Sequence, residues 1–259
     1  MKPIESARAP WLARLYEDPT RYVEEIATVE ARHQVWSSAG WYDPTNPTAF
    51  MLIRTDDKGS QSVYLYAGRH TTWCLEQIPS NAKFYLQTDR RGAQATVATR
   101  PVVLTGTVRY FRLSPAKLAA SRLPPPPNLE TVTWSIDETV TPGGSLCGIQ
   151  VRGFVKEQSV VSASTPFLWP RSAMIGVDTD DRFRRHGLGR HAVGLLIHRL
   201  LERGIAPVYA TDTANVPSMR IAETFFQRHA DLQFLFVGPW KLRRPMDVPD
   251  GLPDSLFLS

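Results

Sequence analysis

The chain has 259 residues, of which 42% are hydrophobic and 21% are charged, so its composition is that of a folded globular protein and excludes extensive disorder. No run approaches the roughly 20 apolar residues that a membrane span needs, and the N-terminus lacks the apolar stretch of a signal peptide. We therefore expect a cytoplasmic protein with no membrane partner. Its two cysteines, Cys74 and Cys147, cannot build a disulfide framework.

The formal net charge of +5 suits either a nucleic acid or a small ligand that carries several phosphates. The arginines are scattered along the chain, and no nucleic-acid-binding motif accompanies them. The charge therefore favours the phosphate-bearing ligand over a nucleic acid.

The first half of the chain mixes helical and strand patterns. We expect helices at 9–16, 19–36 and 114–122, a β-hairpin formed by 50–54 and 62–66, and strands at 82–87 and 101–113. Residues 90–92 are predicted to be the polar end of a strand. The proline run at 123–128 predicts a stiff linker. We therefore expect an N-terminal α+β domain at 1–122 and a second domain at 129–259.

The second half predicts an antiparallel meander followed by alternating helices and strands. The expected strands are 130–137, 147–154, 157–163, 174–179, 205–209 and 234–239, and the expected helices are 187–204 and 219–229. In the first of these helices an apolar stripe should face the sheet, formed by Val193, Leu196, Ile197, Leu200 and Leu201.

The turn between the strand 174–179 and the helix 187–204 carries the strongest functional signal. A helix N-terminus presents unpaired backbone N–H groups and the positive end of the helix dipole, so it can bind an anion. Residues 184–189 have the form Arg-x-x-Gly-x-Gly, in which the glycines allow backbone to approach a ligand. A dinucleotide fingerprint and a Walker loop are both excluded, because the glycine spacing and the Gly-Lys-Ser/Thr ending are absent.

This turn resembles the pyrophosphate loop of the GNAT superfamily of acyl-CoA-dependent acyltransferases, whose signature is Arg/Gln-x-x-Gly-x-Gly/Ala between a strand and a helix. The resemblance extends over roughly residues 145–240, because a second strand follows and Asn215-Val-Pro-Ser218 then starts another helix. The order of residues from Thr179 to Ala222 is most similar to the branch of zwittermicin-resistance type acetyltransferases. The implied fold is α+β, with a splayed mixed sheet flanked by helices. The smaller N-terminal domain is then either a lid or a degenerate GNAT-like half.

The resemblance implies acetyl-CoA, or another acyl-CoA, as cosubstrate. The pantetheine arm would lie along the edge of 175–179, and the pyrophosphate would sit on the N–H groups of the turn. The residues that the resemblance assigns to the cofactor are Val177, Thr179, Arg184, Arg185, His186, Gly187, Leu188, Gly189, Arg190, Asn215 and Ser218.

Acyl transfer to an amine needs a base, an oxyanion contact and a proton for the leaving thiolate. Asp178 and Asp212 are the candidate bases, and a backbone N–H near Val177 or Asp178 is the candidate oxyanion donor. Asn215 is placed with the catalytic residues by the resemblance. Asp212, Asn215 and Ser218 would equally serve as turn and helix-capping residues. Many GNAT enzymes have a tyrosine proton donor where this chain has Ala222.

The leading hypothesis is therefore N-acylation of a small-molecule amine by direct transfer in a ternary complex, in a monomer or homodimer. Two alternatives stay open. One is a non-catalytic acyl-CoA-binding or scaffold module, because the tyrosine is missing, and the other is an enzyme that acylates a protein or RNA amine. No metal is expected, since His186, His191 and His198 lack a carboxylate or cysteine to complete a ligand set.

Overall fold

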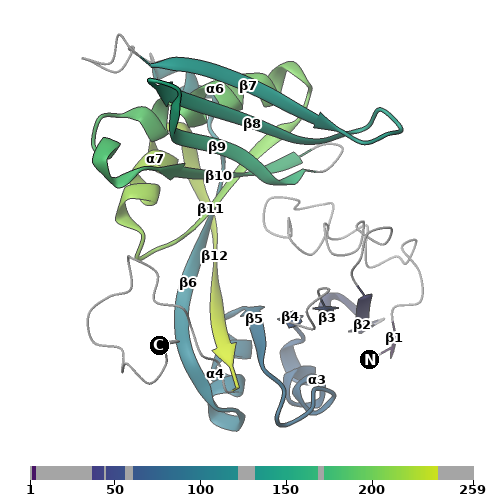
Figure 1. The fold of residues 1–259 in the computed structure, drawn as a ribbon. Helices are drawn as coiled ribbons and strands as arrows, with labels where there is room; N and C mark the ends of the chain where they lie inside the picture. Colours follow the sequence, from purple (N-terminus) through teal and green to yellow (C-terminus); the bar gives the residue numbers. More distant parts are fainter. Residues whose placement is uncertain are drawn as a thin grey trace. The chain divides into compact units, whose positions relative to one another are not determined.

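The computed structural model describes residues 2–3, 37–43, 45–55, 61–121, 132–168 and 172–238. The strands are β1 (Lys2–Pro3), β2 (Ser37–Asp43), β3 (Asn46–Thr55), β4 (Gln61–Tyr66), β5 (Phe84–Thr88), β6 (Val102–Leu113), β7 (Thr133–Val140), β8 (Leu146–Val155), β9 (Gln158–Leu168), β10 (Ser172–Thr179), β11 (Ala206–Asp212) and β12 (Phe226–Val237). The α-helices are α3 (Thr71–Glu76), α4 (Arg90–Thr99), α5 (Pro115–Ala120), α6 (Leu188–Glu202) and α7 (Val216–Phe225), with short 3-10 turns η1 (Gly68–His70) and η2 (Asp181–Phe183). Figure 1 labels these elements.

The described residues fall into two compact units. Unit 1 contains those up to Thr107 together with 231–238, and unit 2 contains Val108 to Ala230. The division therefore lies within β6 and β12. This differs from the expected boundary at 123–128, which lies outside the described residues, as do the helices expected at 9–16 and 19–36.

The two units repeat one order of elements. In unit 1, antiparallel strands β2, β3 and β4 lead through η1 and α3 to β5, which pairs parallel to β4, and then to α4 and β6. In unit 2, antiparallel strands β7 to β10 lead through η2 and α6 to β11, which pairs parallel to β10, and then to α7 and β12. No repeat of residue identity accompanies this repeat of elements.

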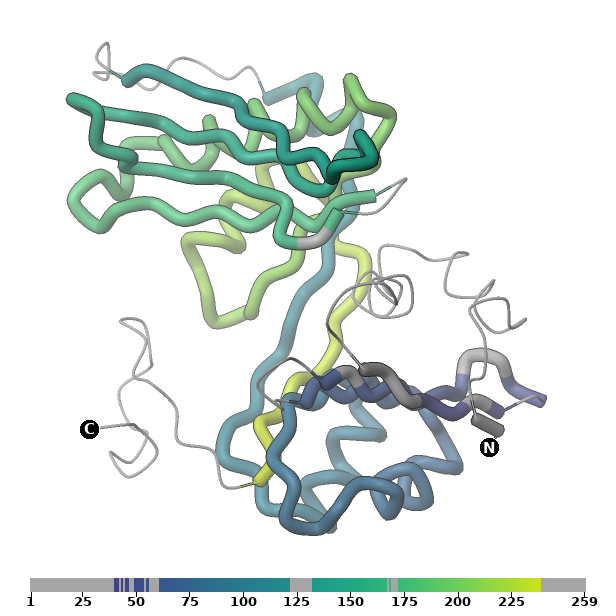
Figure 2. Tube along the Cα trace, turned by 45° about the vertical axis from the view of Figure 1, so that its right-hand side comes forward, coloured from purple at the N-terminus to yellow at the C-terminus, as the bar shows by residue number. Residues whose placement is uncertain are grey.

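The units exchange one strand each. Residues 233–237 of β12 pair with β5 in unit 1, whereas residues 108–112 of β6 pair with β11 in unit 2. The two strands are neighbours in the sheet and run side by side in both views (Figures 1 and 2). Each unit is therefore completed by a strand whose sequence neighbours belong largely to the other unit.

The core of unit 2 forms where α6 packs on β8, β9 and β10. Val193, Leu196, Ile197 and Leu200 of the predicted stripe are buried there, but Leu201 is 42% exposed and lies outside it. On β8 and β9 apolar residues alternate with polar ones, so one face of the sheet is apolar and packs on α6. The predicted mixed α+β architecture is confirmed in this unit.

Three predicted elements needed correction. Residues 90–92 do not end a strand, because they begin α4, where the Asp89 side chain accepts a hydrogen bond from the Gly92 N–H at 2.8 Å. The last strand begins at Phe226, eight residues before the predicted start at 234, and α7 correspondingly ends at Phe225 instead of 229. Neither Gly nor Pro marks that junction, so no local signal indicated it.

Candidate functional site

The parallel strands β10 and β11 separate partway along their length. They pair over four positions, from Ser172 with Ala206 to Ile175 with Tyr209. Beyond that point β10 continues to Thr179 beside β9 alone, while β11 continues beside β6. The ladder between β9 and β10 also shifts register between Met174 and Gly176. The last four residues of β10 therefore have one edge that no described strand pairs with.

The ladder decides which backbone groups face that edge. The Asp180 N–H donates to the Val160 carbonyl at 2.9 Å, which marks residue 180 as directed toward β9. Because this direction alternates along an antiparallel ladder, Asp178 also faces β9, and Val177 and Thr179 face the open edge. Arg184 Nε donates to the Thr179 carbonyl at 3.3 Å, in agreement with this assignment. Of the two predicted oxyanion donors, the geometry therefore favours the Val177 N–H over that of Asp178.

The turn after β10 leaves the N-terminus of α6 without a side-chain cap. Arg185 and Gly187 both have positive φ, 67° and 78°, and Gly187 is the N-cap of α6 without any side-chain cap. No acidic residue occupies the first turn of this helix. The N-cap residue therefore offers no side-chain acceptor to the backbone N–H groups in the first turn of this 15-residue helix. The helix dipole attracts an anion at this same end.

Gly189 has a different role from Gly187. A Cβ at Gly187 would meet open space, so only its left-handed backbone requires glycine. A Cβ at Gly189 would lie 3.2 Å from Ile221 Cδ1, 3.2 Å from Thr179 Oγ1 and 3.5 Å from Val177 Cγ2. Gly189 therefore lets the first turn of α6 pack closely on the end of β10 and on α7.

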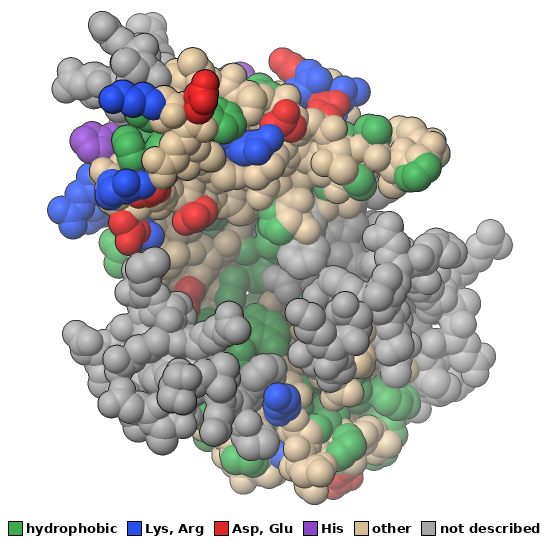
Figure 3. Space-filling model, viewed as in Figure 1, with side chains coloured by type: hydrophobic (Ala, Val, Ile, Leu, Met, Phe, Trp, Pro, Cys, Tyr) green, Lys and Arg blue, Asp and Glu red, His purple; other side chains and the backbone are tan. Residues whose placement is uncertain are grey.

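Ion pairs neutralise part of the basic charge of the turn. Arg182 pairs with Asp180, and hydrogen bonds from the Arg182 side chain lower the pKa of Asp180 to about 2. Arg184 pairs with Asp181 at 2.8 Å. The exposed residues Arg185 and Arg190 form no ion pair within the described part of the chain. In Figure 3, side chains coloured as Lys or Arg, His, and Asp or Glu gather on one side of this unit.

Asp212 and Asn215 lie together in the turn between β11 and α7. Asp212 Oδ1 accepts from the Ala214 N–H at 2.9 Å, and the Asn215 N–H donates to the Asp212 carbonyl at 3.0 Å. The Asn215 side chain caps α7 by accepting from the Ser218 N–H at 3.1 Å. The structural roles that the sequence allowed for these two residues are therefore present.

Asp178 lies apart from that turn. The Val177 and Thr179 side chains approach Gly189 of α6, so the intervening Asp178 side chain points to the opposite face of the strand, where it is exposed. The structure does not bring the two candidate bases together through any hydrogen bond.

Tyr209 lies beside the candidate site residue Ser218, and sequence reasoning did not single it out. Its hydroxyl lies 2.9 Å from Ser218 Oγ, its ring is buried against Phe226, and burial raises its pKa. Ala222, at the expected tyrosine position, is fully buried in the core. In the sequence, Tyr209 is one tyrosine within a predicted strand. Tyrosine is common in strands, so nothing marked this residue as functional.

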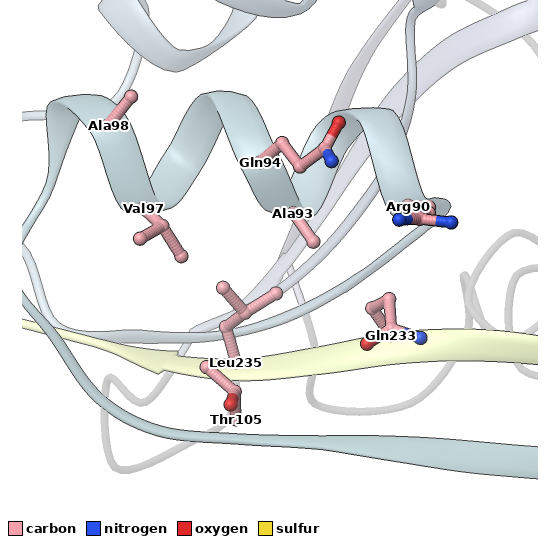
Figure 4. Close-up of a pocket in the computed structure, with 8 residues that line it drawn as sticks. All are labelled: Arg90, Ala93, Gln94, Val97, Ala98, Thr105, Gln233 and Leu235. Carbon is pink, nitrogen blue, oxygen red and sulfur yellow. The ribbon is translucent and has the colours of Figure 1, made fainter.

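A separate groove of about 400 Å³ lies in unit 1, between α4 and strands β12 and β6. Figure 4 shows Val97 of α4 above Leu235 of β12, with Gln94 and Gln233 toward one end. None of the predicted site residues lines it. Within the described ranges, no three His, Cys, Asp or Glu residues gather to hold a metal, and no helix is long and apolar enough to cross a membrane.

Residues 151–230 match the family model described as GNAT acetyltransferase. Over this segment, which is less than half of the chain, the protein is similar to GNAT acetyltransferases. The segment contains β10, the turn, α6, β11 and α7, so every predicted cofactor-binding residue lies within it. No curated protein matches the chain.

Solved structures of GNAT proteins share a fold with most of this chain. A GCN5-related N-acetyltransferase-like protein from Streptococcus suis is 17% identical with a TM-score of 0.56, covering 87% of this chain and 96% of its own. A GCN5-related N-acetyltransferase from Sphaerobacter thermophilus is 13% identical with a TM-score of 0.56, covering 91% and 94%. A tandem GNAT protein from the clavulanic acid biosynthesis pathway is 12% identical with a TM-score of 0.56, covering 91% and 97%. At these identities the likeness concerns the fold.

Proposed function

We propose that this protein is an acyl-CoA-dependent N-acyltransferase. It moves an acyl group, most simply acetyl, to the amine of a small molecule within a ternary complex. One observation carries the proposal. The open edge of β10, created where β10 and β11 separate after Ile175 and Tyr209, leads through η2 and the glycine turn into the uncapped N-terminus of α6. The order of residues from Thr179 to Ala222 supports placing the protein near the zwittermicin-resistance branch.

The pyrophosphate and the pantetheine arm of the cosubstrate each have matching groups. The pyrophosphate would bind the N–H groups of 185–190, with Arg185 and Arg190 adding charge because they are free of the ion pairs that occupy Arg182 and Arg184. Backbone groups of Val177 and Thr179 face the open edge, where the amides of the pantetheine arm would pair with them as a further strand does.

The transfer step needs a stabilised oxyanion and a base. The Val177 N–H would donate to the thioester oxygen as it gains charge. Asp178 is the better candidate base, because its carboxylate is exposed on the face of β10 away from α6, whereas Asp212 Oδ1 is engaged by the Ala214 N–H. The amine would then approach from the Asp178 side and lose its proton directly or through water.

The first experiment is titration calorimetry of the protein with acetyl-CoA, free CoA and a longer acyl-CoA. Two variants sharpen it, Gly187→Asp and Gly187→Asn. Both side chains tolerate a positive φ about equally, so they strain the turn alike and differ mainly in charge. We expect micromolar binding by the wild type, retention of most binding by Gly187→Asn, and loss of at least about tenfold in affinity by Gly187→Asp because a carboxylate then faces the pyrophosphate.

The outcomes separate the candidate functions. Binding followed by acylation of a compound in a panel of small amines supports the proposal. Binding without turnover across that panel, and across peptide and RNA amines, would favour the scaffold module. Absence of binding for all three compounds would contradict the proposed function.

A further inference from the structure

Two hydroxyl groups meet where β10 and β11 separate. Tyr209 is the last residue of β11 that pairs with β10, and its hydroxyl lies 2.9 Å from Ser218 Oγ on α7. Tyr209 is only 1% exposed, whereas Ser218 is half-buried and so is the accessible member of the pair. Within the described part of the chain, the Ser218 hydroxyl is the one hydrogen-bond partner of the Tyr209 hydroxyl.

The position of Ser218 relates directly to that of Ala222. Residues four apart on a helix lie on the same face, and side chains lean toward the helix N-terminus. A long side chain at residue 222 would therefore end above the turn that carries Ser218. Ala222 itself is fully buried and has no group to donate a proton. The Ser218 hydroxyl, held by Tyr209, stands in the region that such a side chain would have reached.

We propose that the Ser218 and Tyr209 hydroxyls form the proton-donating pair for the leaving thiolate of CoA. This inference rests on the proposed function. When the carbon–nitrogen bond forms and the carbon–sulfur bond breaks, Ser218 Oγ–H gives its proton to the thiolate sulfur and takes the Tyr209 proton in exchange. The proton lost by the amine leaves through the base, and Tyr209 regains a proton from solvent before the next turnover. The net products are the amide and the CoA thiol.

Tyr209 supplies what a lone serine lacks. An isolated hydroxyl that gives up its proton becomes an alkoxide, which is a strong base, whereas a phenol is far more acidic and can carry the negative charge. The 2.9 Å contact also holds Ser218 in one orientation. Burial raises the pKa of Tyr209 because it disfavours the phenolate, so the phenolate lasts only until solvent returns a proton.

The variants Tyr209→Phe and Ser218→Ala each remove one oxygen and keep the packing, and Ser218→Thr restores the hydroxyl. We expect Tyr209→Phe, which changes a buried residue outside the predicted cofactor-binding set, to bind acetyl-CoA within about twofold of the wild type. The Ser218 variants are compared by kcat at saturating acetyl-CoA. With acetyl-CoA and an amine that the wild type acylates, Tyr209→Phe and Ser218→Ala should lose about 100-fold in kcat, and Ser218→Thr should recover most of that loss.

The acyl donor distinguishes proton donation from a packing role. An acetyl thioester of an acidic aromatic thiol leaves without needing a proton, so both variants should retain wild-type kcat with that donor within about threefold. Equal losses with both donors, or no loss with acetyl-CoA, would overturn the inference.

A second measurement does not depend on the acceptor amine. The ultraviolet absorbance of the thiolate reports the pKa of the thiol of bound CoA. Donation from Ser218 stabilises the thiolate, so this pKa should be lower on the wild type than on Ser218→Ala and Tyr209→Phe. Failure of CoA to bind the wild type would contradict the proposed function, whereas normal binding with the same thiol pKa in all three proteins would overturn this inference alone.

Discussion

Asp43 Oδ2, at the end of β2, lies 3.0 Å from Nε2 of His70. His70 belongs to the turn of unit 1 that leads from β4 into α3. Arg69 of the same turn approaches the same oxygen at 3.5 Å. This turn has the place in the element order of unit 1 that residues 180–187 have in unit 2. In unit 1 a carboxylate of the chain itself therefore faces the basic residues that precede the helix.

Unit 1 differs from unit 2 in two ways that matter for binding. All five residues of β5 pair with β4, so these parallel strands do not separate. The helix α3 has six residues, against 15 in α6. We therefore predict one acyl-CoA bound per chain. Calorimetry should give a stoichiometry of one, and the Gly187→Asp variant should weaken that single event at least about tenfold instead of leaving half of the binding unchanged. A stoichiometry of two would contradict the prediction.

The second prediction concerns Asp43 and pH. Hydrogen bonds from the hydroxyl and then the backbone N–H of Thr45, followed by His70, hold the pKa of Asp43 well below its usual range. A carboxyl whose pKa is lower in the folded state contributes stability above its unfolded pKa of about 3.9 and loses it as the pH falls further. Asp43→Asn should therefore melt at a lower temperature than the wild type at pH 7, with a smaller difference below about pH 4.

Asp137→Asn is the matched control for this measurement. Asp137 is 50% exposed and pairs with Arg152 at the surface, so its loss should change the melting temperature less than loss of the buried Asp43. A difference between the wild type and Asp43→Asn that grows as the pH falls would show that the carboxylate does not stabilise unit 1.

The third prediction concerns Gly189. A leucine at this position would have to displace Ile221 and the end of β10, because even a Cβ there lies 3.2 Å from two neighbouring atoms. Overpacking of this kind costs about 1–3 kcal/mol, so Gly189→Leu should lower the free energy of unfolding by that amount in urea titrations. Arg190→Leu, one residue away on the exposed side of α6, should leave it within about 0.5 kcal/mol of the wild type.

The fourth prediction compares the two candidate bases. Asp178→Asn should lower kcat by about 100-fold, because the amide cannot accept the proton. Asp212→Asn should change kcat less and stability more, since the Asp212 carboxylate accepts the Ala214 N–H in the turn. The reverse ranking of the two losses in kcat would assign the base to Asp212.

Sequence reasoning located the turn from 184 to 189, the helix behind it and the Asn215 cap, because each depends on residues close together in the chain. It missed α4, whose residues 90–99 carry small side chains in place of a large apolar stripe; Gly92 and Thr96 are its buried residues. It also placed the start of β12 too late, since nothing local separates Phe225 from Phe226.

The sequence by itself determined the chemistry of the anion-binding turn, because glycine conformation, helix capping and charge are properties of a few adjacent residues. Only the tertiary structure decided where β10 and β11 separate, that β6 and β12 are exchanged between the units, and that Tyr209 meets Ser218. Strand partners are chosen by side-chain packing across the whole sheet, between residues as distant in sequence as Arg112 and Val208, and a local pattern does not specify that choice.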